Sequence, residues 1–223
     1  MPEIYRGPVQ QQKNTTRIGE GSEHEVYRRN DGKIVKEKSP NFHALMNTPE
    51  YLHAEFFLTK IAHLLFPNSI PDIHAIHLTS NKGETQTIHE HMDTSIDSYH
   101  ENVRQSWIDQ NHPIPKYELI QDELTQRAQA VTPFQSELMN TGIVLFDRSL
   151  QNYIVSPTGI QYVDRLYPLQ WDETKGTYIS IDTTKLRQAI ERKIQDPDQK
   201  NVALRYVTRL ESFLQELEKQ KKK

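Results

Sequence analysis

The sequence predicts an α+β fold, in which strands and helices occupy separate stretches of the chain. Strand-like runs lie within residues 16–38, where an Asn-Asp-Gly turn separates two of them. Apolar residues near helical spacing follow at 51–66, and the tail at 183–217 carries further helical stripes. The chain of 223 residues is long enough for one large domain or for two lobes with a substantial core.

Composition excludes several classes of protein. The net charge of −3 gives no electrostatic case for a nucleic-acid partner. The absence of cysteine excludes disulfides and thiolate metal sites, and it agrees with an expected cytoplasmic location. No apolar run approaches the roughly 18–20 residues of a membrane span, so no membrane partner is expected. The N-terminus lacks the apolar core of a signal peptide.

A β-hairpin is predicted over residues 23–38. Its turn, Asn30-Asp31-Gly32, consists of residue types that tolerate the positive φ of tight turns. Strand alternation places Lys36 and Lys38 on one face, so both are candidates for a lysine that reaches a bound phosphate. We favour Lys36, because it directly follows the apolar pair at 34–35.

A glycine pair precedes this hairpin, in the run Gly19-Glu20-Gly21-Ser22, and Val26 follows. Glycine lets backbone N–H groups approach phosphates closely, because no Cβ intervenes. His24 stands where a third glycine would complete a glycine-rich nucleotide loop. The alternative interpretation is an ordinary turn.

The stretch 51–66 is predicted to be helical, with Thr48 as its cap and Pro49 at its first position. Glu55 falls among the apolar positions of this helix. A buried carboxylate needs a partner, and we expect Lys36 of the preceding hairpin to provide it. A half-exposed Glu55 at the edge of the apolar stripe is the alternative.

Two further strands are predicted at 72–78 and 84–91, and residues Glu90 to Met92 would lead out of the β-rich part. From Asp93 onwards the chain is expected to be mostly helical. One helix is predicted at 116–130, and a separate segment begins at Pro133.

Gly142 is predicted to end that segment. In the tail, Thr183 or Thr184 is expected to cap a helix, and a second helix follows Pro197. Its apolar stripe consists of Val202, Tyr206, Leu210, Phe213, Leu214 and Leu217, for which core packing is the expected role.

Asp147 and Asn152 lie five residues apart, and Asp164 follows Asn152 by twelve. Strands at 153–155 and 160–163 are predicted to form a hairpin, which would bring Asn152 and Asp164 together. Magnesium prefers oxygen ligands and leaves part of its coordination sphere to substrate phosphates. Asn152 and Asp164 are therefore candidate metal ligands, and Asp147 is a candidate for orienting an attacking hydroxyl.

Taken in order, these elements resemble the protein-kinase-like superfamily, which includes aminoglycoside-phosphotransferase-type and small atypical kinases. The resemblance covers residues 18–166. It implies a two-lobed fold and a single bilobal catalytic unit. The N-lobe at 1–92 would be small and β-rich, with one main helix, and would bind the nucleotide. The C-lobe at 93–223 would be reduced and mostly helical, and would carry the catalytic and metal-binding residues.

The resemblance further implies phosphoryl transfer from ATP, with Mg²⁺, to a hydroxyl of a small-molecule or protein acceptor. Asp147 would take the proton of the hydroxyl, while Asn152 and Asp164 would hold Mg²⁺. Lys36, held by Glu55, would steady the α- and β-phosphates. The remaining nucleotide contacts would come from Gly19, Gly21, Ser22 and Val26 of the loop and from Glu90 and Met92 of the hinge.

The chain departs from the pattern of regulated protein kinases. Leu145-Phe146 stands where many of them have His-Arg, and Asp164-Arg165-Leu166 replaces Asp-Phe-Gly. No Ala-Pro-Glu motif follows. These departures favour a compact small-molecule or atypical kinase. Two alternatives stay open: a catalytically inactive, pseudokinase-like binding or scaffold protein, and an α+β protein whose motif order is accidental.

Overall fold

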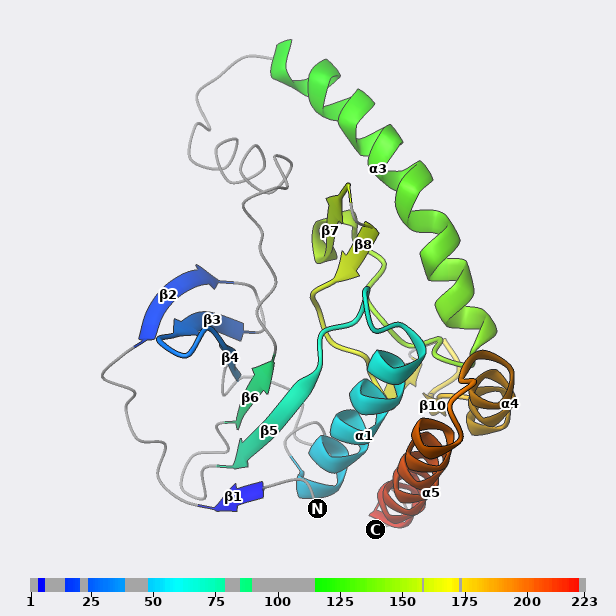
Figure 1. Cartoon of the computed structure of the whole chain (residues 1–223). Coiled ribbons are helices and arrows are strands. Elements are labelled where there is room, and N and C mark those ends of the chain that lie inside the picture. The colour runs from blue at the N-terminus through cyan, green and yellow to red at the C-terminus, as the bar shows by residue number, and fades with distance from the viewer. Residues whose placement is uncertain are drawn as a thin grey trace.

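The computed structural model describes residues 4–6, 15–20, 24–38, 48–78, 85–89, 115–157, 159–172 and 174–220. Within these ranges the chain forms a six-stranded sheet, two two-stranded hairpins and four α-helices (Figure 1). The predicted α+β class is confirmed.

The large sheet has the strand order β1-β5-β6-β4-β3-β2. Neighbouring strands are antiparallel except β1 and β5, which are parallel. Strand β4, which carries Lys36, lies between β3 and β6 and is therefore not an edge strand. The strands are β1 (Ile4–Arg6), β2 (Thr15–Glu20), β3 (His24–Arg29), β4 (Ile34–Lys38), β5 (Ile73–Leu78) and β6 (Thr85–His89).

The β3–β4 hairpin forms where the sequence predicts it. Gly32 adopts φ +81°, a left-handed conformation that favours glycine. The Asp31 carboxylate accepts a hydrogen bond from the Lys33 backbone N–H at 3.2 Å, which closes the turn. The resulting register places Val26 directly opposite Lys36.

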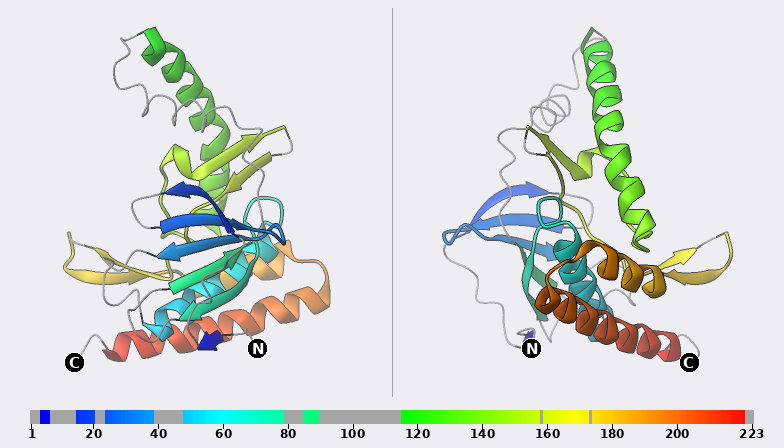
Figure 2. Two further views of the ribbon diagram at one scale, coloured as in Figure 1. Left: turned by 90° about the vertical axis from the view of Figure 1, so that its left-hand side faces the viewer. Right: turned by 45° about the vertical axis from the view of Figure 1, so that its right-hand side comes forward.

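Helix α1 (Pro49–Leu65) begins as predicted, because Thr48 Oγ1 accepts a hydrogen bond from the Tyr51 N–H at 3.3 Å and Pro49 occupies the first turn. Most of its side chains are buried, so the helix needs cover on more than one side. It contacts β5 of the sheet and lies alongside α5 (Pro197–Gln220), as Figure 2 shows.

The main hydrophobic core therefore joins α1 to the C-terminal half of the chain. It includes Tyr51, Leu58 and Ile61 of α1 together with Leu138, Tyr162, Leu186, Val207 and Leu210. A second, small cluster of Val35 and Ala75, with Tyr27 against it, belongs to the sheet. Helix α1 is thus covered mainly by residues that follow position 92.

Helix α3 (Pro115–Asn140) runs without interruption through Pro133, so the predicted break is wrong (Figure 1). Proline removes one helical hydrogen bond, the one from residue 133 to the Gln129 carbonyl. Thr132 donates its hydroxyl to the Ala128 carbonyl at 2.6 Å. Phe134 packs edge-on against Phe66. Tertiary packing therefore holds this turn helical.

The C-terminal helices follow the prediction in outline. Helix α3 ends before Gly142, which has φ +92°. Asp182, rather than Thr183 or Thr184, caps α4 (Thr183–Lys193) by accepting from the Lys185 N–H at 3.0 Å. In α5 the stripe is buried at Leu210, Leu214 and Leu217, and it also includes Ala203 and Val207, which the prediction omitted.

Strands β9 (Leu169–Asp172) and β10 (Thr177–Ser180) form a hairpin that the sequence did not predict, and it projects from the body of the molecule (Figure 2). Among the described residues, no helix has an apolar stretch sufficient to cross a bilayer.

Candidate functional site

The predicted hairpin after Asn152 is confirmed. Strands β7 (Tyr153–Ser156) and β8 (Gly159–Tyr162) pair with Tyr153 opposite Tyr162. A short 3₁₀ helix, η2 (Leu150–Asn152), precedes β7. At the base of the hairpin, the Val163 N–H donates to the Asn152 carbonyl at 2.9 Å. Asn152 therefore lies across from the residue that immediately precedes Asp164.

The segment that carries Asp147 lies beside the same region. Phe146 and Leu166 form an isolated β-bridge, and the Tyr167 N–H donates to the Leu145 carbonyl at 2.9 Å. The charge of Asp147 acts on Asp164, as one of the causes that raise the pKa of that carboxyl. The structure thus places the segments that carry Asp147, Asn152 and Asp164 next to one another.

Lys36 reaches this site from the sheet. Its Nζ donates a hydrogen bond to the Val163 carbonyl, which adjoins Asp164. Burial lowers the pKa of Lys36, and the nearby Asp164 carboxylate acts in the opposite direction. The side chain of Lys38, the alternative phosphate lysine, lies outside the described residues.

Burial likewise dominates the titration of Asp164. It raises the pKa of this carboxyl above 3.8, and the charge of Lys36 offsets the increase in part. Both members of the Lys36–Asp164 pair are therefore displaced toward their neutral forms by desolvation. Such perturbed pairs occur both at functional sites and in structural charge networks. The functional interpretation of Lys36 and Asp164 therefore depends on the geometry around them.

Glu55 does not form the predicted ion pair with Lys36. Its carboxylate is paired with Arg165, whose Nε donates to Oε1 at 2.5 Å and whose Nη2 donates to Oε2. Both side chains are only 5% exposed. A planar guanidinium matches a carboxylate with two parallel hydrogen bonds, which an ammonium group cannot do. Glu55 remains close enough for its charge to act on Lys36.

Two polar residues of α3 belong to the site, although the sequence interpretation missed them. Arg127 is buried and donates from Nε to the Leu150 carbonyl at 3.0 Å. Gln135 donates from Nε2 to the Arg148 carbonyl at 3.1 Å. The sequence could have indicated both residues, because each lies four positions from the buried Val131 and therefore on the same face of the helix.

Tyr162 connects the segments that carry the two aspartates. Its hydroxyl donates to the Arg165 carbonyl at 2.9 Å, and the backbone of Asp147 acts on the same hydroxyl. Burial raises the pKa of Tyr162, so the phenol stays protonated and can keep this hydrogen bond. For Tyr153, burial raises the pKa to about 12.

The donor set suits a metal that also binds phosphate. Among the described residues, no three His, Cys, Asp or Glu side chains converge to hold a metal ion. The predicted oxygen ligands are the Asp164 carboxylate and the Asn152 amide, and Mg²⁺ commonly completes so sparse a set with phosphate oxygens and water. Asn152 Nδ2 is buried without a hydrogen-bond partner among the described residues. This atom is a donor and does not bind a cation, so the fit of the site to such a metal depends on the oxygens of the Asp164 carboxylate and the Asn152 amide.

The predicted nucleotide loop and hinge are described only in part. Gly19 lies in β2 opposite Val26, next to a register shift between Arg17 and Gly19. The other residues predicted for these contacts, Gly21, Ser22, Glu90 and Met92, lie outside the described residues.

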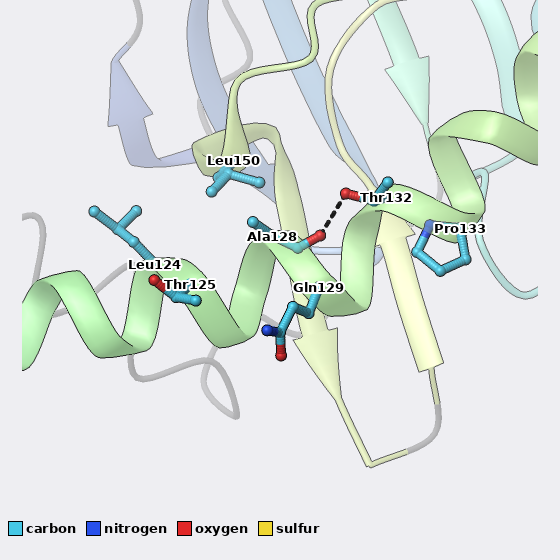
Figure 3. A pocket seen from close by; sticks show the side chains of 7 residues that line it. All are labelled: Leu124, Thr125, Ala128, Gln129, Thr132, Pro133 and Leu150. Carbon is cyan, nitrogen blue, oxygen red and sulfur yellow. Dashed lines mark hydrogen bonds between the residues drawn. The ribbon is translucent and has the colours of Figure 1, made fainter.

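A shallow hollow on α3 lies apart from these groups (Figure 3). Most of its lining comes from one stretch of the helix, and Leu150 closes one side. None of the predicted site residues lines it. The lining residues are Leu124, Thr125, Ala128, Gln129, Thr132, Pro133 and Leu150.

No model of a known protein family matches the chain, and a search of curated proteins finds no match. What the structure defines is thus an α+β protein with a partly buried polar site, and the functional interpretation depends on that site.

Proposed function

We propose that this protein is an ATP-dependent phosphotransferase of the protein-kinase-like class. It would transfer the γ-phosphoryl group of Mg-ATP to a hydroxyl of a small-molecule or protein acceptor. One observation carries the proposal: Lys36 of the sheet donates to Val163, beside Asp164 and across the hairpin base from Asn152. A cation of the sheet therefore lies next to the base of the hairpin that carries both proposed metal ligands.

The residues divide the work of such a transfer as follows. Lys36 would bind phosphate oxygens in place of the Val163 carbonyl. Asn152 and Asp164 would hold Mg²⁺, which neutralises phosphate charge when bound. Asp147 would accept the proton of the acceptor hydroxyl as its oxygen forms a bond to the γ-phosphorus and the bond to the ADP oxygen breaks. Positioning and charge neutralisation account for most of the rate of such reactions.

In this proposal Glu55 acts indirectly. Its partner Arg165 directly follows Asp164, so the buried ion pair anchors the backbone of the metal-binding segment to α1. Lys36 then needs no carboxylate from α1, because the negative charge of the nearby Asp164 compensates its positive charge. The arrangement of a β-rich sheet with one main helix beside it also supports the kinase-like interpretation.

A second candidate is a nucleotide-binding module without transfer activity. It is favoured by the pairing of Glu55 with Arg165, which differs from the lysine–glutamate pair that the resemblance implies for an active kinase. The Asp147 carboxylate also accepts hydrogen bonds from the Ser149 N–H at 2.9 Å and hydroxyl at 2.8 Å. A catalytic base would need to exchange one of these for a substrate hydroxyl.

Thermal melting with ATP, with and without Mg²⁺, tests nucleotide binding. ATP at 100 times its dissociation constant stabilises the native state by about 2.7 kcal/mol. For a chain of this size that is a rise in Tm of roughly 5–11 °C. We expect this rise to require Mg²⁺ and to disappear in Asp164→Asn. Asp198→Asn, an exposed change in the first turn of α5, is the matched control and should keep the full rise.

Turnover separates the two candidates. Release of ADP in the presence of a panel of hydroxyl-bearing acceptors should be lost in Asp147→Asn while Mg-ATP still raises the Tm. Mg-ATP binding without turnover on any acceptor would favour the binding module. No Tm rise with or without Mg²⁺ would reject both candidates.

A further inference from the structure

Helix α3 holds the loop that precedes the hairpin. The buried guanidinium of Arg127 donates from Nε to the Leu150 carbonyl at 3.0 Å and from Nη2 to the Tyr153 carbonyl. These two carbonyls lie on either side of Asn152 in the sequence. Arg127 therefore holds the backbone on both sides of Asn152 in the sequence.

A second group on the same helix acts one step earlier in the loop. Gln135 Nε2 donates to the Arg148 carbonyl at 3.1 Å and to the Tyr153 hydroxyl at 3.0 Å. Arg148 directly follows Asp147. Together, Arg127 and Gln135 attach both ends of the segment 148–153 to α3.

The positions of the two carbonyls account for an arginine at this place. Placing a cation in the interior has a large desolvation cost, and Arg127 is only 5% exposed. Its rigid fork can nevertheless satisfy two carbonyls at fixed separation, which the single ammonium of lysine cannot do. A group with this geometry sets the spacing between the Leu150 and Tyr153 carbonyls, and so the orientation of the residue between them.

We propose that Arg127 is a positioning residue, which orients the Asn152 amide toward a divalent cation by fixing the carbonyls of Leu150 and Tyr153. This inference rests on the proposed function, in which Asn152 is a metal ligand. Groups that orient metal ligands typically contribute 10–100-fold to metal affinity. Arg127 should therefore act on the metal dependence of nucleotide binding rather than on nucleotide binding in general.

The test is a Mg²⁺ titration of the Tm at a fixed concentration of ATP, for wild type, Arg127→Lys and Arg127→Met. We expect the Mg²⁺ midpoint to rise at least 10-fold in both variants. Arg187→Met is the matched control. Arg187 also bridges two helices, through Glu211 and Thr208 of α5, and its loss should lower the Tm without moving the midpoint.

Hydrogen exchange without nucleotide measures the loop itself. Residues 150–156 should exchange faster in both Arg127 variants, and the β9–β10 hairpin should not change. If Arg127→Met does not fold, Arg127→Lys, which keeps the buried charge, decides both measurements.

The outcomes separate the two ideas. Wild-type protein without Mg²⁺-dependent ATP binding rejects the proposed function, and the positioning role falls with it. Wild-type binding combined with an unchanged Mg²⁺ midpoint in the Arg127 variants rejects the positioning role alone. In that case, faster exchange at 150–156 would show that Arg127 supports the loop for stability only.

Discussion

The Glu55–Arg165 ion pair offers a direct test of how this site is built. Both side chains are only 5% exposed, and two hydrogen bonds join them. Replacing Glu55 with Gln leaves the Arg165 guanidinium buried without its counter-charge. One of its nitrogens, Nη1, already has no hydrogen-bond partner among the described residues. We therefore expect Glu55→Gln to be strongly destabilising.

The magnitude follows from the geometry. Charge centres roughly 4 Å apart attract by about 4 kcal/mol at an effective dielectric constant near 20. Breaking one member of a buried pair typically costs about 3–5 kcal/mol, because the remaining charge is uncompensated. For a chain of this size the Tm should fall by roughly 6–20 °C. Removing both charges, as in Glu55→Gln with Arg165→Met, should recover most of this loss.

A double-mutant cycle measured by urea unfolding at pH 7 gives the coupling energy. We expect about 2 kcal/mol or more between Glu55 and Arg165. A second cycle, which combines Glu55→Gln with Lys36→Met, should give less than about 1 kcal/mol, because those two groups interact through space without a hydrogen-bonded pair. Charge loss at Lys36 is thus the internal control for charge loss at Arg165.

The opposite order of the two coupling energies would refute this explanation. A larger coupling between Glu55 and Lys36 would mean that the protein in solution forms the pair that the sequence predicts. It would also remove the argument that Glu55 acts through the Asp164 backbone.

Three further predictions concern the fold and its pH dependence. Gly142→Ala should lower the free energy of unfolding by roughly 2–5 kcal/mol, because φ is +92° and the new Cβ would lie 2.3 Å from the Asp182 carbonyl oxygen. Gly176→Ala, which has open space around it, should cost only about 1–2 kcal/mol. Equal losses of the two variants in urea unfolding would contradict this. Thr48→Ala should cost about 1 kcal/mol through loss of the α1 cap, and a helix content unchanged by circular dichroism is the control. Burial raises the pKa of Asp164 above 3.8, so the native state holds this proton more tightly than the unfolded state does, and the group's contribution to stability falls as the pH rises above that value. Wild type should therefore lose stability relative to Asp164→Asn between pH 4 and pH 8 in urea unfolding, and a difference that grows in favour of wild type would disprove the shift.

Much of the fold could be predicted from local sequence patterns. The turn at Asn30-Asp31-Gly32, the cap at Thr48 and the strands on either side of residues 156–159 were predictable because each depends on residues close together in the sequence. The convergence of Asn152 and Asp164 was predictable for the same reason, since a hairpin joins them.

The predictions that failed depended on distant partners. Pro133 lies within α3, where the neighbouring Phe134 packs against Phe66, a contact that the local sequence does not specify. The partner of Glu55 is 110 positions away in the sequence, and the chemical difference between an ammonium and a guanidinium selected it over Lys36. The β9–β10 hairpin, with the exposed Trp171 against Tyr178, was missed for another reason: its turn signal, Asp172 and Gly176, was present in the sequence and was overlooked.

By itself, the sequence determined the α+β class, the amphipathic helices and the order of the polar residues that meet in the site, because periodicity and turn chemistry are properties of neighbouring residues. The tertiary structure alone decided that α1 is buried against α5, that Arg165 neutralises Glu55, and that Arg127 on α3 grips the backbone around Asn152. Burial determined each of these contacts. A charge or an apolar face removed from water must find a partner, and the nearest suitable partner is known only once the chain has folded.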